Sequence, residues 1–395
     1  MSIKRVLLSI YTVCFAIAAM AQTTETLDNG MQELAHRLLY AKQGSIVAIE
    51  PSTGEIKCLV SESYMADTVN RALGVEYSPG STFKVAQALT LVSENVLNAK
   101  SSFSCNKGFW RGKVHIGCHA HRSSLTLVPA IGHSCNSYFC KAFMNMINNR
   151  ERYHTYSKAI NVWSYYMHSM GLGRKLGVDV AGEKPGLIPD SAYLAKVHKG
   201  GWNAETIMWV GMGQGEVMVT PLQLCNLAAS IANRGFYIVP HVKKYSDKDS
   251  LYKKYNAKQY CKPTAEAYEL VIEGMRNAVT QGTARHINSA EYEICGKTGT
   301  AENEGKDHSV FIGFAPKTNP RIAVAVFVEN GGWGADLAAP LGALMIEQAM
   351  NGKLSGRSEL KAQQWEDMDV IPTEYDYDYE DECNEKRMLL CPENS

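Results

Sequence analysis

Glu293-Ile294-Cys295-Gly296-Lys297-Thr298-Gly299-Thr300-Ala301 is the most informative stretch of this sequence. Tyr292, Ile294 and Cys295 suit a strand, and the two glycines let another backbone come close. This pattern predicts a strand at the edge of a sheet. An extended peptide can bind such an edge by adding to the sheet as a further strand.

Two earlier motifs complete an ordered set with this strand. Ser81-Thr82-Phe83-Lys84 matches S-x-x-K, and Ser134-Cys135-Asn136 matches S-x-N, ahead of the K-T-G that begins at Lys297. A serine acyltransferase needs a nucleophile, a proton shuttle and a substrate-binding edge, and the motifs supply them in that order. The triplet therefore predicts an active-site serine enzyme.

Each motif alone is weak. Ser104-Cys105-Asn106-Lys107 and Ser358-Glu359-Leu360-Lys361 also match S-x-x-K. Context favours Ser81, because Ser78-Pro79-Gly80 is a turn and helix-start signal and apolar residues follow at helical spacing. A lone S-x-x-K is usually a helix-capping serine beside a solvated lysine. Because all three motifs occur in order, we interpret Ser81 as a nucleophile and not as a helix cap.

The spacing gives Ser81 a base. Positions i and i+3 share a helix face, so Lys84 can approach the Ser81 hydroxyl. Burial and a nearby cation such as Lys297 would lower the pKa of Lys84 and favour its neutral form. Ser134 lies where a loop passes into a helix that we expect over residues 137–147. It could act as the proton shuttle, or it could cap this helix.

With these motifs the chain resembles the penicillin-binding proteins and serine β-lactamases, and more closely the class B penicillin-binding proteins of the elongation type. The resemblance covers roughly residues 45–351 and includes the first hairpin at 47–60 and the segment Asn70-Arg71-Ala72. Further matching segments are 182–189, 213–223, two strands at 309–316 and 321–330, and a closing helix at 336–350.

The resemblance implies an α/β fold of the penicillin-binding-protein transpeptidase and serine β-lactamase type. This fold is a sandwich with a mainly antiparallel sheet, helices on both of its faces and an added helical lobe. Ser81 would lie between the sheet and the lobe.

The resemblance also implies a reaction. The chain would be a peptidoglycan D,D-transpeptidase acting on D-Ala-D-Ala stem peptides, or a D,D-carboxypeptidase if water accepts the acyl group, and β-lactams would acylate it. Ser81 would attack, Lys84 would be the base and Ser134 would relay the proton. The implied substrate contacts are Asn136, Lys297, Thr298, Gly299 and Thr300.

Two alternatives remain at this point. A serine β-lactamase needs a base for deacylation, and none of the carboxylates between the second and third motifs stands in a recognisable context for that role; Glu183 is expected to be a structural acceptor. A non-enzymatic β-lactam sensor is normally tethered to a membrane signalling segment, and no second apolar run of about 20 residues follows the leader. A peptidoglycan-binding module would be favoured if a triplet residue were missing, and the triplet is complete.

The sequence divides into four parts. Residues 1–21 have the basic start, short apolar core and Ala19-Met20-Ala21 end of a secretory signal peptide, with an uncleaved anchor as the alternative. Residues 22–42 are a short linker or helix, 43–352 the catalytic domain and 353–395 a disordered acidic tail. The chain is therefore expected to be exported, either to the periplasm or to the outer face of the cytoplasmic membrane.

Composition and family departures bear on partners. The 395 residues are 45% hydrophobic and carry 40 basic and 40 acidic side chains, which gives no sign of nucleic-acid binding. In the family a large N-terminal pedestal domain docks partner proteins, and this chain is expected to be a truncated form without that domain. Cell-wall elongation proteins are therefore an open expectation as partners, and the reaction is expected to need no cofactor.

The cysteines near Ser134 allow two structural interpretations. Cys105, Cys118, His121 and Cys135 could bind a structural zinc ion through three thiolates and one imidazole. Alternatively, Cys105 and Cys118 could form a disulfide in an oxidising compartment, or all the thiols could be free. Some elongation-type relatives have a metal site at the matching loop, with varied ligands.

Overall fold

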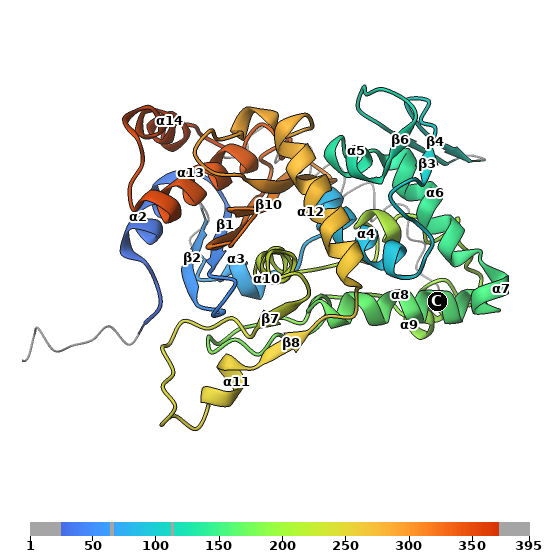
Figure 1. Cartoon of the computed structure of the whole chain (residues 1–395), viewed down its shortest axis with the longest axis horizontal. Coiled ribbons are helices and arrows are strands. Elements are labelled where there is room, and N and C mark those ends of the chain that lie inside the picture. Colours follow the sequence, from blue (N-terminus) through green and yellow to red (C-terminus); the bar gives the residue numbers. More distant parts are fainter. Residues whose placement is uncertain (1–24, 64–66, 112–113, 371–395) are drawn as a thin grey trace, which may run out of the picture.

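The computed structural model describes residues 25–63, 67–111 and 114–370. At its centre lies a five-stranded antiparallel sheet in the order β2-β1-β11-β10-β9, built from both ends of this part of the chain (Figure 1). Its strands are β1 (Gly44–Ile49), β2 (Ile56–Glu62), β9 (Cys295–Ala301), β10 (His308–Ala315) and β11 (Ile322–Val328). The predicted edge position of the Lys297 strand is confirmed, since β9 ends the sheet.

The central strand β11 shows why the sheet is covered on both faces. All seven of its residues are buried, because neighbouring side chains point to opposite faces and each face has its own core. Ala323, Ala325 and Phe327 belong to one hydrophobic cluster, whereas the residues between them belong to the other. Because both faces of this strand are buried, its sequence is a continuous apolar run.

Helices cover the two faces. One face packs against α2 (Asn29–Leu38) and α13 (Ala338–Asn351), and the other against α10 (Pro221–Ala232), which leads into the helical lobe (Figure 1). The other helices are α3 (Arg71–Gly74), α4 (Lys84–Ser93), α5 (Leu127–Gly132), α6 (Asn136–Ile147), α7 (Arg150–Tyr153), α8 (Tyr156–Ser169), α9 (Ser191–Val197) and α12 (Ala265–Thr280), with 3₁₀ turns η1 (Gly80–Phe83), η2 (Val210–Met212) and η3 (Arg285–Ile287).

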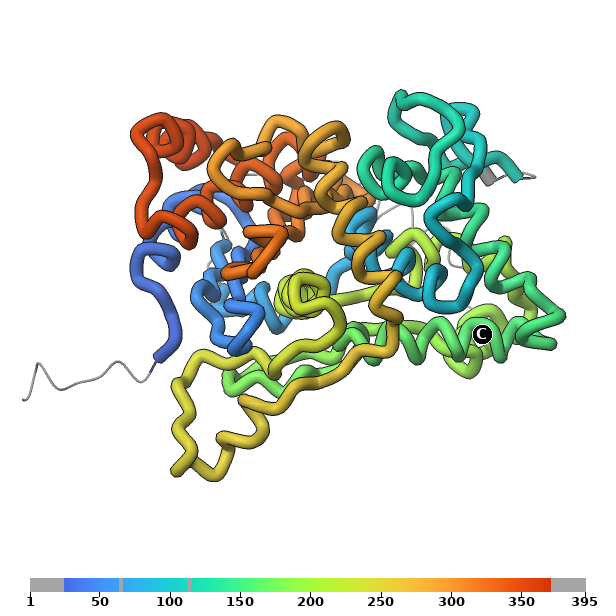
Figure 2. The backbone as a smooth tube through the Cα atoms, viewed as in Figure 1, coloured from blue at the N-terminus to red at the C-terminus, as the bar shows by residue number. Residues whose placement is uncertain are grey.

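Three short strand pairs stand apart from the main sheet. β3 (Ser102–Phe103) pairs with β6 (Leu125–Thr126), and β4 (Gly108–Arg111) pairs with β5 (Val114–Gly117). The third pair, β7 (Phe236–Ile238) and β8 (Lys258–Tyr260), carries α11 (Tyr252–Asn256) at the end of a projecting loop. The backbone trace shows this loop extending away from the body (Figure 2).

The predicted start of the disordered tail at residue 353 is wrong. Gly356–Glu366 form a helix, α14, whose Ala362 is fully buried. Arg37 on α2 binds Glu359 at 2.7 Å and Glu366 at 2.9 Å and so holds α14 against the body. The predicted leader and the acidic run at 374–382 lie outside the described residues. Within residues 25–370 as described, no helix has the length and apolarity to cross a bilayer.

Candidate active site

A tight turn brings Ser81 to the edge strand. Ser81 lies in η1, directly before α4, and Gly80 has a left-handed φ of +53°. A Cβ atom at Gly80 would lie 2.4 Å from the Thr300 carbonyl oxygen, so only glycine allows this approach. The turn therefore places the candidate nucleophile beside the K-T-G motif.

Lys84 is the first residue of α4 and is fully buried. Its Nζ donates to Ser81 Oγ at 2.5 Å, to Asn136 Oδ1 at 2.6 Å and to Ser134 Oγ at 3.3 Å. Burial lowers the pKa of Lys84 to about 8, because desolvation disfavours the ammonium form. A substantial neutral fraction is then present near neutral pH, as a general base requires.

The second motif is held by the junction of α5 and α6. Ser134 adopts a left-handed φ of +54° in this junction, and the Cys135 side chain caps α6 by accepting from Tyr138 N. Asn136 Nδ2 donates to the Gly117 carbonyl oxygen at 2.7 Å, while its Oδ1 faces Lys84. The sharp turn thus directs two polar side chains of one short segment at the same amine.

The third motif lies on β9. Lys297 is fully buried, its Nζ donates to the Thr298 carbonyl oxygen at 2.7 Å, and burial together with the charge of Lys84 holds its pKa well below the usual value. The hydroxyl of Thr298 lies 2.7 Å from that of Thr283. Thr300 Oγ1 accepts from Gly334 N at 3.3 Å.

These motifs line one cleft of about 330 Å³. The two predicted lysines, Lys84 and Lys297, lie buried beside the cleft. The six other predicted residues form its walls: Ser81, Ser134, Asn136, Thr298, Gly299 and Thr300. The sequence did not indicate six further lining residues: His119, Thr283, Glu302, Asp307, Trp333 and Ala335. None belongs to a recognisable motif, and only the fold shows that the rings of His119 and Trp333 meet, with centroids 4.7 Å apart.

The cysteine cluster lies next to this cleft. The ligand atoms of Cys105, Cys118, His121 and Cys135 all lie within 4.8 Å of one another, and the sulfurs of Cys118 and Cys135 are 4.0 Å apart. All four side chains converge from the loop before α5 and from the start of α6. Cys105 and Cys118 are free in the structure, so it does not contain the disulfide that was the alternative.

Two features of the cluster suit a metal ion. Tetrahedral zinc with bonds of about 2.3 Å separates its sulfur ligands by roughly 3.8 Å, close to the observed distance. His121 Nε2 is buried and has no hydrogen-bond partner among the described residues, while its Nδ1 lies 3.0 Å from the Arg122 carbonyl oxygen. This arrangement is typical of a ligating histidine, whose second nitrogen is fixed by a backbone carbonyl.

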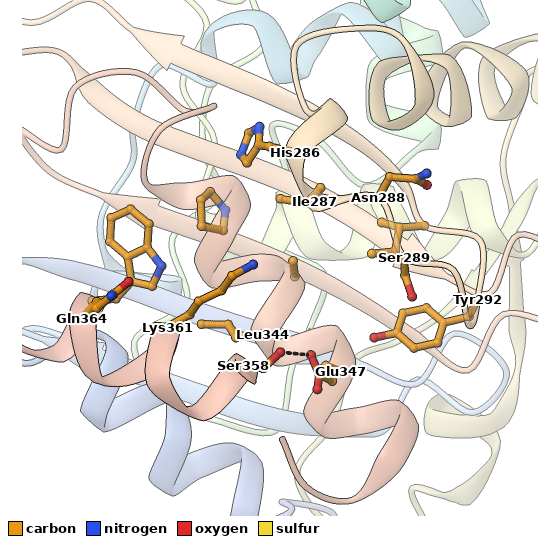
Figure 3. Close-up of a pocket in the computed structure, with 14 residues that line it drawn as sticks. His286, Ile287, Asn288, Ser289, Tyr292, Leu344, Glu347, Ser358, Lys361 and Gln364 are labelled. Carbon is orange, nitrogen blue, oxygen red and sulfur yellow. Dashed lines mark hydrogen bonds between the residues drawn. The ribbon is translucent and has the colours of Figure 1, made fainter. Parts of the chain in front are cut away.

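A second hollow, of about 410 Å³, contains another S-x-x-K match (Figure 3). Ser358 and Lys361 of α14 line it together with residues of α13 and of the segment before β9. Ser358 Oγ donates to Glu347 at 2.5 Å, and in Figure 3 the Lys361 amine points away from this pair. No residue of the three active-site motifs lines this hollow, so the S-x-x-K matches at Ser81 and Ser358 lie in different sites of the structure.

Comparisons with known proteins agree with this geometry. Residues 44–347 match the penicillin binding protein transpeptidase domain. The chain is 31% identical over 369 residues to the peptidoglycan D,D-transpeptidase MrdA of Acinetobacter baumannii, which covers 80% of this chain and 52% of that protein. It is 29% identical to the peptidoglycan D,D-transpeptidase PbpA of Mycobacterium tuberculosis, covering 79% and 68%.

The solved structures show the same relationship. PBP2 of Pseudomonas aeruginosa in complex with WCK 5153 aligns with a TM-score of 0.71 and 30% identity, over 84% of this chain and 77% of that one. A chain from a peptidoglycan synthase complex aligns with a TM-score of 0.72 and 25% identity, over 84% and 63%. The chain spans about half the length of the MrdA proteins it matches.

Proposed function

The chain belongs to the penicillin-binding protein transpeptidase family, and from this premise we propose that it is a peptidoglycan D,D-transpeptidase that is acylated on Ser81. One observation carries the proposal. A fully buried lysine, Lys84, lies 2.5 Å from the Ser81 hydroxyl and 3.3 Å from the Ser134 hydroxyl. A base and a proton relay therefore meet at one nucleophile.

The first half-reaction acylates the enzyme. Neutral Lys84 takes the proton of Ser81 while Oγ attacks the carbonyl carbon of the penultimate D-Ala in a stem peptide. The resulting tetrahedral intermediate collapses, its C–N bond breaks, and Ser134 passes the proton from Lys84 to the departing amine. Terminal D-Ala leaves, and an ester joins the stem peptide to Ser81.

The second half-reaction resolves the ester. An amine of a neighbouring stem peptide attacks the same carbonyl carbon and gives up its proton through Ser134 to Lys84. The ester bond between that carbon and Ser81 Oγ then breaks, and Lys84 passes the proton to Oγ and restores the hydroxyl. This attack forms a cross-link. Attack by water releases the shortened peptide instead and is carboxypeptidase activity.

The edge strand would bind the substrate. An extended stem peptide can pair with β9, where Thr298 and Thr300 are the proposed contacts of a terminal carboxylate and Asn136 that of a peptide group. Lys297 lies buried beside them and would need to turn from the Thr298 carbonyl oxygen to reach the carboxylate. The backbone N–H groups of Ser81 and Thr300 are the proposed oxyanion hole, and each such donor contributes about 3 kcal/mol in the transition state.

The β-lactamase alternative finds little support in this geometry. Glu183 accepts from Leu176 N at 2.5 Å and from Gly177 N at 2.9 Å, and it does not line the cleft. It is thus engaged as a structural acceptor. No carboxylate between Asn136 and Lys297, a stretch that the structure describes throughout, lines the cleft.

An assay of D-Ala release tests the proposal. The protein is incubated with a pentapeptide ending in D-Ala-D-Ala and with an acceptor amine, and both free D-Ala and the coupled peptide are measured. Wild type is expected to release D-Ala, and Ser81→Ala is expected to release none. Acylation by penicillin without any release of D-Ala from the pentapeptide would favour the sensor alternative and contradict the proposal.

We also propose that Cys105, Cys118, His121 and Cys135 bind a structural zinc ion. Zinc would supply cross-linking of the loop before α5 to the start of α6, and Cys135 would thereby fix its neighbour Ser134. Metal analysis of the purified protein should give one equivalent of zinc, which Cys118→Ser loses and the matched Cys261→Ser retains. A mass two hydrogens lower with no zinc would identify the disulfide instead.

We infer that the protein works outside the cytoplasm, at the periplasmic or outer face of the cytoplasmic membrane, where its substrate is cross-linked. The sequence of residues 1–21 supports this location, and a fusion to alkaline phosphatase, which is active only after export, tests it. Cell-wall elongation proteins are the proposed partners, since the similar chain noted above comes from a peptidoglycan synthase complex.

A further inference from the structure

The projecting loop between β7 and α12 is strongly basic. Residues 243–262, here called the lysine arm, contain seven lysines and two aspartates, a net charge of +5 in a chain that is neutral overall. Every one of the seven lysines is exposed. The arm extends away from the body, as the ribbon and the backbone tube both show (Figures 1 and 2).

The lysine charges are not neutralised locally. Across the described ranges, none of the seven lysines forms an ion pair with a carboxylate. Lys254 lies over the ring of Tyr255 and Lys258 over that of Phe236, at 4.6 and 4.3 Å from the ring centroids. The arm therefore presents its positive charge to solvent, where it attracts anionic surfaces within about 10 Å.

The same arm exposes large apolar side chains. Tyr260 is 76% exposed, Leu251 47% and Tyr252 36%. Tyrosine rings are enriched at the boundary of a lipid bilayer, because they have an apolar body and a polar tip. Exposed tyrosine and leucine among unpaired lysines is the combination that interfacial membrane segments use.

The arm also lies where the described chain begins. Thr26 N donates to the Val242 carbonyl oxygen at 2.8 Å, and Glu25 forms a β-bridge with Lys243. The apolar stretch of the leader ends at Ala18, seven residues before Glu25. Seven extended residues span at most about 25 Å. A leader inserted in a bilayer would therefore keep the base of the arm close to the headgroups.

We propose that the lysine arm is a contact surface for the anionic phospholipid headgroups of the membrane. The surface is independent of the acyl-transfer chemistry, since none of its residues lines the active-site cleft. Contact there would hold the catalytic domain in one orientation to the bilayer beside the leader. Lipid is favoured over an anionic polymer because the exposed tyrosines suit the boundary of a bilayer.

Sedimentation with vesicles tests this proposal on the full chain. The protein is mixed with sucrose-loaded vesicles of phosphatidylcholine alone or with one quarter phosphatidylglycerol, and the partition coefficient is measured. The variant carries Lys→Gln changes at Lys243, Lys244, Lys248 and Lys253. The matched control carries the same change at four exposed lysines outside the arm: Lys100, Lys158, Lys196 and Lys199.

Wild type and control should bind the anionic vesicles, and the arm variant should bind them at least tenfold more weakly. This loss is expected because each lysine near an anionic surface strengthens binding by roughly fivefold. Raising the salt to 1 M should remove most of the difference. All three proteins should still be acylated by penicillin at equal rates, which shows that they are folded.

Two results would overturn the proposal. One is equal binding of wild type and arm variant to the anionic vesicles, which would assign the contact to the leader alone. The other is a wild-type protein that does not bind anionic vesicles, as expected if the acidic run at 374–382 neutralises the positive charge of the arm. Neither result depends on transpeptidase activity, so this proposal can fail while the proposed function stands.

Discussion

Ser81 and Ser358 are each followed by a lysine three residues later, and their surroundings differ completely. Ser81 and Lys84 lie where η1, α4 and β9 meet, with the lysine fully buried. Ser358 and Lys361 lie on α14, where the lysine is exposed and the serine donates to Glu347 (Figure 3). The motif is the same, but only one pair has the environment of a nucleophile and its base.

Burial is what separates the two pairs. It lowers the pKa of Lys84 to about 8, and the amine is then bound by two hydroxyl groups and one amide oxygen. Lys361 is exposed to solvent, and Ser358 donates to Glu347 instead. The reactivity of a serine with a lysine three residues later therefore depends on the tertiary surroundings of the pair.

The largest effect is expected on covalent labelling. Ser81→Ala should abolish the penicillin adduct in intact-mass measurements, because the acyl group has no other activated acceptor in the cleft. Ser358→Ala is the matched control and should give the wild-type adduct. An adduct that persists in Ser81→Ala and disappears in Ser358→Ala would reverse the assignment.

The next effect is on the rate of labelling. Lys84→Met should slow acylation by about 10²–10⁴-fold, the usual contribution of a general base, whereas Lys361→Met should leave the rate unchanged. Stopped-flow measurement with a chromogenic cephalosporin gives both rates. Circular dichroism of each variant checks that it is folded. A folded Lys84→Met protein with the wild-type rate would remove Lys84 from the mechanism.

Loss of the proposed zinc site should have a moderate effect on both stability and rate. Cys118→Ser should lower Tm by roughly 5–10 °C, as expected for a loss of a few kcal/mol in a domain of this size, and slow acylation less than tenfold. Calorimetry and the same labelling assay measure the two effects. Cys261→Ser serves as the control, and an equal loss in that variant would argue against a specific metal site.

The smallest effect concerns the β-lactamase alternative. Glu183→Gln should lower the free energy of unfolding by about 1–3 kcal/mol, because two backbone N–H groups lose a charged acceptor. The lifetime of the penicillin adduct should stay that of wild type and of the exposed control Glu151→Gln. Urea denaturation and the mass of the adduct over hours report the two quantities. A longer lifetime in Glu183→Gln alone would make this glutamate a deacylating base.

Much of the fold could be predicted because its signals are local. The strand at residues 309–316 is observed as His308–Ala315, and the closing helix at 336–350 as Ala338–Asn351. Both are long apolar runs bounded by turn residues. The helix α14 was missed because Ala362 is its only buried residue, so it has almost no apolar periodicity. Ion pairs with Arg37, more than 300 residues earlier, hold it in place.

The active site also contains some residues that the sequence indicates and others that it does not. Its polar residues are present in the three motifs, and their order along the chain gave the chemistry. His119, Thr283 and Trp333 have no such signal, since they reach the cleft only through tertiary packing. The close approach of Gly80 to Thr300 likewise depends on a left-handed turn that only the folded chain shows.

If a neutral, buried Lys84 activates Ser81, the rate of acylation must depend on pH through the titration of Lys84. Because its pKa is lowered to about 8, the neutral fraction and the acylation rate of wild type should rise with pH and level off above a midpoint near pH 8. A rate that is flat from pH 6 to 9, or that still rises past pH 10 as for an ordinary lysine, would contradict the account.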